Sequence, residues 1–259
     1  MDKWHSPIFI TGCPRSGTSM IADVLLRCGA YGGNVSEPHR FSPRSLVEHI
    51  GIFEQIVKPF LLDIKACPAG QFPLPSLENL AIPTGWQNKI EDILSREGYD
   101  GKAPWMYKSN KLALLWPVWE YTYPNAKWII VRRRTGDIIQ SCLQTTYMQA
   151  FKTSKNIEAI GVTTEEEAWK WWVHWYERRF VEMIEHGLNV KIVWPERMVN
   201  GDYQQIYEAV EWAGLQWNSD APAIIDPKFW KARRRDANGN PHESNRRKTD
   251  NRKRVVNAN

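Results

Sequence analysis

The sequence predicts an α/β fold in which a central parallel β-sheet is flanked by helices on both faces. Two observations support this prediction. Short apolar runs alternate along the chain with longer segments whose apolar residues recur at helical spacing. The first apolar run also leads through a glycine-bounded loop into an amphipathic segment, in the order strand, loop, helix. Strands that alternate with helices favour a parallel sheet that is covered on both faces.

Each expected element follows from its own pattern. Strands are expected over residues 7–12, 105–108, 127–131 and 190–193, where apolar residues run together. Helices are expected over residues 18–28, about 45–64, 87–97, 112–121, 136–148, 165–185 and 203–213. Three acidic residues open the segment 165–185, as suits the positive end of a helix dipole. Residues 67–85 contain four prolines and are expected to be irregular.

Length and charge predict one domain with a basic tail. A chain of 259 residues with 42% apolar residues can bury one substantial core, which we assign to residues 1–230. Residues 231–259 hold ten Lys and Arg against three acidic residues, a charge of +7, whereas the rest of the chain carries −2. The tail has too few apolar residues to order itself and is expected to be disordered. It could be solvated, close over a bound polyanion, or contact nucleic acid, and we consider nucleic acid the weakest of the three.

The cysteines and the absence of targeting patterns indicate the compartment. The four cysteines form no CxxC pair and accompany no His-rich segment, so free thiols are expected rather than a metal site or a disulfide framework. No signal peptide and no membrane span are found in the sequence. We therefore expect a cytoplasmic protein without a bound metal.

The loop after the first strand has the spacing of a phosphate-binding loop. Gly12 and Gly17 bound four residues, so that backbone N–H groups can turn toward an anion at the start of the following helix. A nucleotide-binding Walker A loop would continue with lysine, but Thr18 follows Gly17, and the cation of this loop is Arg15. A tyrosine phosphatase would need an arginine where Ser19 stands, six residues after Cys13.

Together with a second motif, this loop resembles the sulfotransferases, which use 3′-phosphoadenosine 5′-phosphosulfate (PAPS) as donor and release 3′-phosphoadenosine 5′-phosphate (PAP). The first motif, PRSGTS, resembles their 5′-phosphosulfate loop. In KWIIVRRRTGDIIQS, Arg133, Asp137 and Ser141 repeat the spacing of the family's 3′-phosphate motif. The resemblance implies a P-loop-like sulfotransferase fold, with a donor site formed by Cys13, Pro14, Arg15, Ser16, Gly17, Thr18, Ser19, Arg133 and Ser141.

The resemblance covers about residues 5–215 and includes features of the bacterial-type and tyrosylprotein branches. Lys108 aligns with a lysine that stabilises the transferring group in tyrosylprotein sulfotransferases, although Ser109 and Asn110 replace the usual Asp-Pro. Arg132 and Arg134 do not fit the spacing and are interpreted as solvated charges beside the site.

The chemistry requires fixed cations rather than a covalent nucleophile, because charge spreads over the sulfuryl oxygens and grows on the leaving phosphate. Arg15 and Lys108 are the candidate catalytic cations. Glu37 is the candidate base, since the resemblance places a glutamate about twenty residues after the loop arginine, and His39 and Glu48 are its rivals.

The acceptor is not identified by the sequence. Trp169, Trp172, Tyr176 and Phe180 recur at helical spacing and are interpreted as core, while one or two rings of the same helix, with Trp171 and Trp175 beside them, could line an acceptor pocket. The expected partner is a small-molecule, carbohydrate or peptide acceptor. Two alternatives remain open: a nucleotide or small-molecule kinase with a degenerate phosphate loop, and a catalytically silent nucleotide-binding module.

Overall fold

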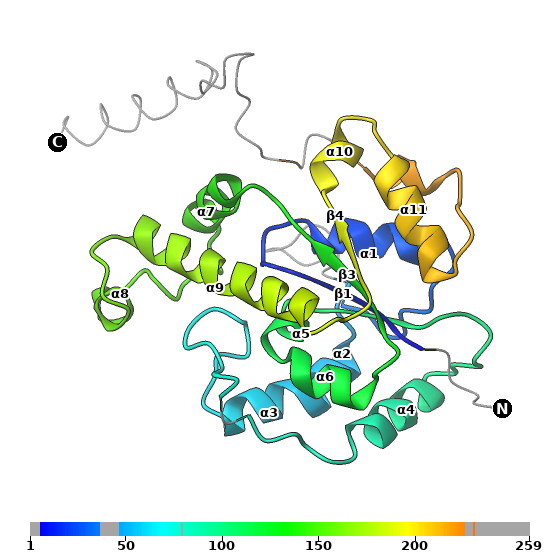
Figure 1. Ribbon diagram of the computed structural model, residues 1–259, viewed down its shortest axis with the longest axis horizontal. Coiled ribbons are helices and arrows are strands. Elements are labelled where there is room, and N and C mark those ends of the chain that lie inside the picture. The colour runs from blue at the N-terminus through cyan, green and yellow to red at the C-terminus, as the bar shows by residue number, and fades with distance from the viewer. Residues whose placement is uncertain (1–5, 37–46, 79, 226–229, 231–259) are drawn as a thin grey trace. The chain divides into compact units, whose positions relative to one another are not determined.

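Four parallel strands form the centre of the fold, in the spatial order β2-β1-β3-β4 (Figure 1). They are β1 Ile8–Gly12, β2 Met106–Lys108, β3 Lys127–Val131 and β4 Val190–Val193. Ile8 pairs with both Met106 and Lys127, and Gly12 pairs with Val131. The structure is a computed structural model, and it describes residues 6–36, 47–78, 80–225 and 230. The predicted parallel α/β sheet is confirmed.

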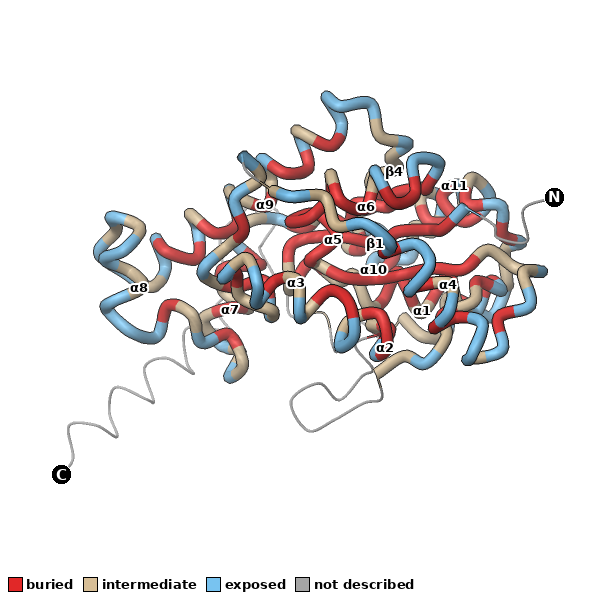
Figure 2. Tube along the Cα trace, turned by 90° about the horizontal axis from the view of Figure 1, so that it is seen from below, coloured by how far each residue is buried: buried red, intermediate tan, exposed pale blue. Residues whose placement is uncertain are grey.

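Both faces of the sheet are buried at β1 and along most of β3, which explains why these two strands are mainly apolar. Phe9 packs edge-on against Trp128 on the neighbouring strand and against Trp119, with ring centroids 4.8 and 5.2 Å apart. Ile8 and Ile10, which point to the opposite face, are fully buried too. Figure 2 shows the strands inside the buried interior.

Helices surround this sheet. They are α1 Thr18–Arg27, α2 Ile50–Ile52, α3 Lys58–Asp63, α4 Trp86–Arg96, α5 Lys111–Leu114, α6 Trp116–Thr122, α7 Thr135–Gln144, α8 Ser154–Ala159, α9 Glu165–Glu185, α10 Pro195–Val199 and α11 Gln204–Ala213, with the π-helical turn η1 Phe53–Val57 and the 3-10 turn η2 Ala221–Ile224. In Figure 1, α10 and α11 lie above the strands and α5 and α6 lie below them. Within the described residues, no helix has both the length and the apolar character that crossing a bilayer requires.

The long helix α9 begins and ends where the sequence predicted. Its start is fixed by a capping box, in which the Thr164 hydroxyl accepts a hydrogen bond from the Glu167 N–H and the Glu167 carboxylate accepts one from the Thr164 N–H. Three acidic residues in its first turn add a favourable interaction with the helix dipole.

Prolines explain two departures from the expected helices. In the segment expected as one helix over 45–64, residues 47–49 are not helical and residues 45–46 lie outside the described part, so the described helix begins at Ile50. Its π turn, in which the Lys58 N–H bonds to the Phe53 carbonyl, accommodates Pro59, which has no N–H to donate. The helix expected over 112–121 is likewise divided at Leu115, just before Pro117 in the first turn of α6.

The remaining corrections concern short elements. The helix expected over 136–148 ends at Gln144, and the sequence did not predict α8, α10 or η2. The chain divides into the units Met1–Pro227 and Lys228–Asn259. The predicted basic tail, residues 231–259, lies outside the described residues and stays a prediction.

Parallel strands place all their carboxyl ends at one edge of the sheet. Gly12 ends β1, Lys108 ends β2 and Val131 ends β3, and these three strands are direct neighbours. The phosphate loop, the Lys108 segment and the arginines after β3 therefore leave the sheet at the same edge, where α/β proteins bind their ligands.

Candidate functional site

The loop from Gly12 to Gly17 depends on a glycine at the end of β1. A Cβ atom at Gly12 would lie 2.5 Å from the Val131 carbonyl oxygen and 2.6 Å from the Ser16 hydroxyl oxygen. Both distances are shorter than real Cβ contacts allow, so only glycine lets the loop pass this close to β3. The loop then turns through Arg15 and Gly17, whose φ angles are 75° and 99°.

The start of α1 faces this loop and has the features of an anion site. Gly17, the N-cap residue, has no side chain with which to cap the helix, and the first turn contains no acidic residue. The Ser16 hydroxyl oxygen is buried and has no hydrogen-bond partner among the described residues. A buried polar atom without a partner is costly unless a ligand satisfies it. The loop therefore fits a phosphate group, with the helix dipole and Ser16 directed at it.

Arg15 connects the loop to the second predicted motif. Its Nε donates a hydrogen bond to the Ser141 hydroxyl (2.9 Å) and its Nη1 donates one to the Tyr147 hydroxyl (2.5 Å). Ser141 belongs to α7, and Tyr147 follows that helix. The predicted donor-site residues Arg15 and Ser141 are thus brought together, 126 positions apart in the chain.

Arg133 supports the loop from the other side. Its Nη1 donates a hydrogen bond of 2.9 Å to the backbone carbonyl of Arg15. The side chain is buried, and burial lowers the pKa of its guanidinium, although Asp137 and Glu196 nearby act in the opposite direction. A largely desolvated guanidinium interacts strongly with a phosphate. Arg133 and Ser141 follow β3, the strand beside β1, and β1 leads into the Gly12–Gly17 loop. The resemblance implies this arrangement.

The two neighbouring arginines differ from each other. Arg134 is 68% exposed, and its Nε lies 3.6 Å from Glu196, which agrees with a solvated charge. Arg132 instead donates a hydrogen bond to the Glu177 carboxylate of α9 and packs 5.2 Å from the ring centre of Trp194. The interpretation of Arg132 as a solvated charge is therefore wrong, because an ion pair and an aromatic ring hold it.

A thiol rather than a thiolate lies in the loop. Burial raises the pKa of Cys13 well above its usual value, and Cys142 and Glu177 act in the same direction. Burial likewise raises the pKa of Cys142 to about 12. Both groups are neutral at physiological pH, so neither opposes an anion or acts as a nucleophile. All four cysteines are free, as predicted.

Lys108 lies at the end of β2 in a buried cluster of charges. Its side chain is 7% exposed, and no described residue accepts a hydrogen bond from its ammonium group. Burial lowers the pKa of Lys108 to about 8, and Glu48 and Asp23 partly offset this while Lys111 adds to it. The pKa of Lys108 is thus close to physiological pH, and its ammonium group has no direct partner among the described residues.

Glu48 lies beside Lys108 but is bound to other groups. Its carboxylate accepts hydrogen bonds from Lys111 Nζ at 2.8 and 3.0 Å and from the Ser109 hydroxyl at 2.6 Å. Burial alone would raise the pKa of Glu48, but Lys111 and Lys108 outweigh it and hold that pKa below its ordinary value. Lys111 also packs 4.4 Å from the centre of the Phe53 ring. The other two base candidates, Glu37 and His39, lie outside the described residues.

The aromatic residues of α9 divide into two sets. Trp169, Trp172, Tyr176 and Phe180 are buried, as core packing requires. Trp171 and Trp175 are partly exposed and stack on each other, with ring centres 5.6 Å apart. The buried set also anchors the Pro-rich stretch, because Trp172 Nε1 and the Tyr176 hydroxyl both donate hydrogen bonds to the Gly70 carbonyl.

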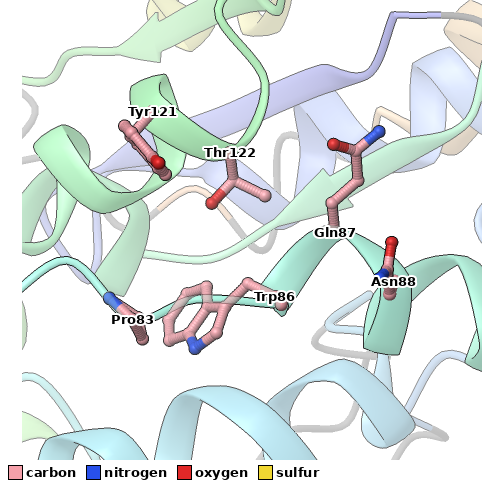
Figure 3. A pocket seen from close by; sticks show the side chains of 7 residues that line it. Pro83, Trp86, Gln87, Asn88, Tyr121 and Thr122 are labelled. Atoms are coloured by element: carbon pink, nitrogen blue, oxygen red, sulfur yellow. The ribbon is translucent and has the colours of Figure 1, made fainter.

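A small pocket lies elsewhere, between the start of α4 and the end of α6 (Figure 3). It is lined by Pro83, Gly85, Trp86, Gln87, Asn88, Tyr121 and Thr122. Thr122 ends α6 shortly before β3 begins, so the pocket lies toward the amino end of the strands, away from the phosphate loop. Among the described residues, no group of three or more His, Cys, Asp or Glu side chains could hold a metal ion.

Three residues of this region were not predicted from the sequence. Tyr147 and Gln71 lie in irregular segments without a motif, and only their spatial contacts distinguish them. Lys111 lies three residues after Lys108, and its pairing with Glu48 could not be inferred because 62 residues separate the two.

Comparison with known proteins agrees with this geometry. A family profile described as "Sulfotransferase family" matches residues 7–219. No protein with a curated description matches the sequence. Among solved structures, the sulfotransferase domain from the curacin biosynthetic pathway is similar, with 15% identity, a TM-score of 0.50, and coverage of 93% of this chain and 89% of that one.

Two further solved structures are similar to this chain. The sulfotransferase domain of the Synechococcus PCC 7002 olefin synthase has 18% identity and a TM-score of 0.48, and the match covers 88% of this chain and 86% of that domain. Sulfotransferase STF9 from Mycobacterium avium has 11% identity and a TM-score of 0.46, and the match covers 85% of this chain and 67% of STF9. The profile match spans most of the chain, and the curacin-pathway domain shares its fold. This chain belongs to the sulfotransferase family.

Proposed function

We propose that this protein transfers a sulfuryl group from PAPS to a hydroxyl or amine of a small-molecule, carbohydrate or peptide acceptor. One observation carries the proposal: the phosphate loop and the Arg133–Ser141 segment are joined through Arg15. A donor with one phosphate at the 5′ position and another at the 3′ position needs two anion sites at a fixed separation. Two neighbouring anion sites support such a donor better than a single phosphate site would.

The 5′-phosphosulfate is assigned to the loop. Its backbone amides, the unpartnered Ser16 hydroxyl and the first turn of α1, including Thr18 and Ser19, would bind the phosphate. The 3′-phosphate is assigned to Arg133 and Ser141, a guanidinium and a hydroxyl that together suit a phosphate. Cys13 and Pro14 contribute backbone to the same loop.

The transfer breaks the bond between sulfur and the bridging oxygen of the 5′-phosphate and forms a bond between sulfur and the acceptor oxygen or nitrogen. Negative charge grows on the leaving phosphate, and the acceptor loses a proton. Arg15 and Lys108 are the cations proposed to stabilise that charge, since fixed charges in a buried site act strongly. Arg15 contacts the Ser141 side of the site here, so its action on the leaving oxygen remains a proposal.

One of the three candidates for the proton acceptor lies in the buried charge cluster around Lys108. Glu48 lies in that cluster, is ionised, and is committed to Lys111 and Ser109. Those contacts favour a structural role for Glu48, which leaves Glu37 as our first candidate and His39 as the other rival.

Tryptophan fluorescence can test the donor proposal, because the chain has fourteen tryptophans. Wild-type protein and Arg133→Ala would be titrated with PAP, with 5′-AMP, and with ATP plus magnesium. We expect PAP to bind best and the variant to lose more than about tenfold in PAP affinity, or about 1.4 kcal/mol. Preference for ATP, or equal PAP binding by both proteins, would contradict the proposal and favour the kinase alternative.

A further inference from the structure

Tyr147 contacts the loop arginine, although no sequence motif includes it. Its hydroxyl accepts a hydrogen bond of 2.5 Å from Arg15 Nη1, and the Arg15 guanidinium carbon lies 5.6 Å from the centre of the tyrosine ring. Arg15 Nε binds Ser141 at the same time. Two hydroxyl groups from α7 and its following segment therefore fix the direction of one guanidinium.

The direction of these hydrogen bonds matters. Both hydroxyl oxygens accept from Arg15, so each hydroxyl keeps its own proton for another acceptor. Among the described residues, neither Ser141 nor Tyr147 donates that proton, and Arg15 Nη2 has no hydrogen-bond partner. Two O–H groups and one N–H₂ group thus remain available beside each other. Such a set of donors around a positive charge suits a phosphate oxygen.

Gln71 holds the tyrosine segment in place. Its side chain is 7% exposed, donates a hydrogen bond to the Tyr147 carbonyl (2.9 Å) and accepts two from the N–H groups of Gln149 and Ala150 (2.9 and 3.1 Å). All three bonds end within four residues, so one side-chain amide fixes the backbone that carries Tyr147. Gly70, the preceding residue, is bound to α9 through Trp172 and Tyr176.

We propose that Tyr147 determines specificity for a nucleotide with a second phosphate, and that Gln71 is a positioning residue acting through Tyr147. Tyr147 holds Arg15 against Ser141, so that the two hydroxyl protons are available to the phosphate that is not at the 5′ position. The inference rests on the proposed PAPS site and adds two residues to it. A 5′-mononucleotide lacks this phosphate and gains nothing from Tyr147.

The test compares PAP with 5′-AMP as probes, by tryptophan fluorescence, on the full chain. Tyr147→Phe keeps the ring and removes the hydroxyl, and it should weaken PAP binding about tenfold, as expected for a lost hydrogen bond to a charged group. Its 5′-AMP affinity should change less than about twofold on the same argument. Gln71→Ala should lower the PAP preference in the same direction by a smaller factor. Tyr207→Phe, which removes a tyrosine hydroxyl bound to Glu211 on α11, is the matched control and should change neither affinity.

Each result has a definite meaning. A wild-type protein that does not prefer PAP to 5′-AMP overturns the proposed donor and this inference with it. A wild-type preference that persists in Tyr147→Phe overturns this inference alone. Equal weakening of both probes, with a lower unfolding temperature, shows a merely structural role and also overturns it. A double-mutant cycle with Ser141→Ala should give non-additive losses of PAP affinity, because both hydroxyls act on the same guanidinium, and additive losses would contradict that.

Discussion

Arg15 and Lys111 lie at the same edge of the sheet, and their surroundings neutralise their charges to different degrees. The guanidinium of Arg15 contacts the neutral hydroxyls of Ser141 and Tyr147. The ammonium of Lys111 contacts both oxygens of the Glu48 carboxylate. A cation bound by hydroxyls keeps its full charge for an arriving anion, whereas one paired with a carboxylate is already compensated. The surroundings of Arg15 therefore suit an anionic ligand, whereas the charge of Lys111 is balanced by Glu48 without a ligand.

Removing the carboxylate of the compensated region should have the largest effect. Glu48→Gln leaves Lys111, whose side chain is 5% exposed, charged without its partner, and should cost about 3 kcal/mol of unfolding free energy. Adding Lys111→Met should recover part of that loss, since position 111 then carries no buried charge. Because the pKa of Glu48 is held below its ordinary value, the contribution is present at neutral pH and is lost as pH falls through the acidic range.

Urea unfolding of the two single variants and the double variant measures this cycle. A Glu48→Gln variant as stable as wild type would show that Glu48 is not needed to compensate the charge of Lys111. The contrast between the two regions would then fail.

Filling the space at Gly12 should come next in size. Gly12→Ala brings a Cβ against the Val131 carbonyl and should cost about 2 kcal/mol, as overpacking does, together with a loss of PAP binding. Gly136→Ala is the matched control for stability, because its Cβ would meet nothing within 4 Å and alanine favours the helix α7. Thermal unfolding of both variants, with PAP titration of Gly12→Ala, checks the prediction. Unchanged stability and binding in Gly12→Ala would show that the close passage of the loop against β3 is not required.

The smallest effect concerns Lys108, which interacts electrostatically with Glu48, the same carboxylate that binds Lys111. Its pKa of about 8 means that its charge is present below that pH and lost above it. If Lys108 faces the sulfuryl group, the affinity for PAPS should fall as pH rises through about 8, by roughly fivefold or about 1 kcal/mol. Lys108→Arg should keep its charge over this pH range, so its affinity for PAPS should not show this pH-dependent step. Lys108→Met has no charge to lose, so it should also lack the step, and its affinity for PAPS should be lower than that of wild type throughout. Fluorescence titration with PAPS between pH 6.5 and about 9.5 measures the step, and an identical step in Lys108→Met would assign it to another group.

The sequence predicted the regular parts of the fold well. The strands 127–131 and 190–193 and the helix 165–185 have their predicted bounds. Short, mainly apolar segments mark the strands, and three acidic residues mark the start of the helix. Prolines inside helical patterns were harder, since the local pattern does not show whether Pro59 is accommodated by a π turn or Pro117 begins a new helix. Short helices such as α8, which has no buried residue, give no apolar pattern to detect.

The site was predictable where motifs are local. Gly12 to Ser19 and Arg133 to Ser141 each lie within one strand–loop–helix segment, and their residue types indicate the chemistry. The contacts of Arg15 with Tyr147, and of Gln71 with the Tyr147 segment, join positions 132 and 76 residues apart, and depend on tertiary structure alone.

The pairing of β1 with β3 sets a distance that no side chain can adjust. Gly12 and Val131 are partners in adjacent strands, which lie about 4.8 Å apart in any sheet. The backbone pairing therefore fixes how far apart the groups that follow the two strand ends begin. The separation between the loop that follows β1 and Arg133, which follows β3, is thus set by the backbone pairing before any side chain contacts a ligand.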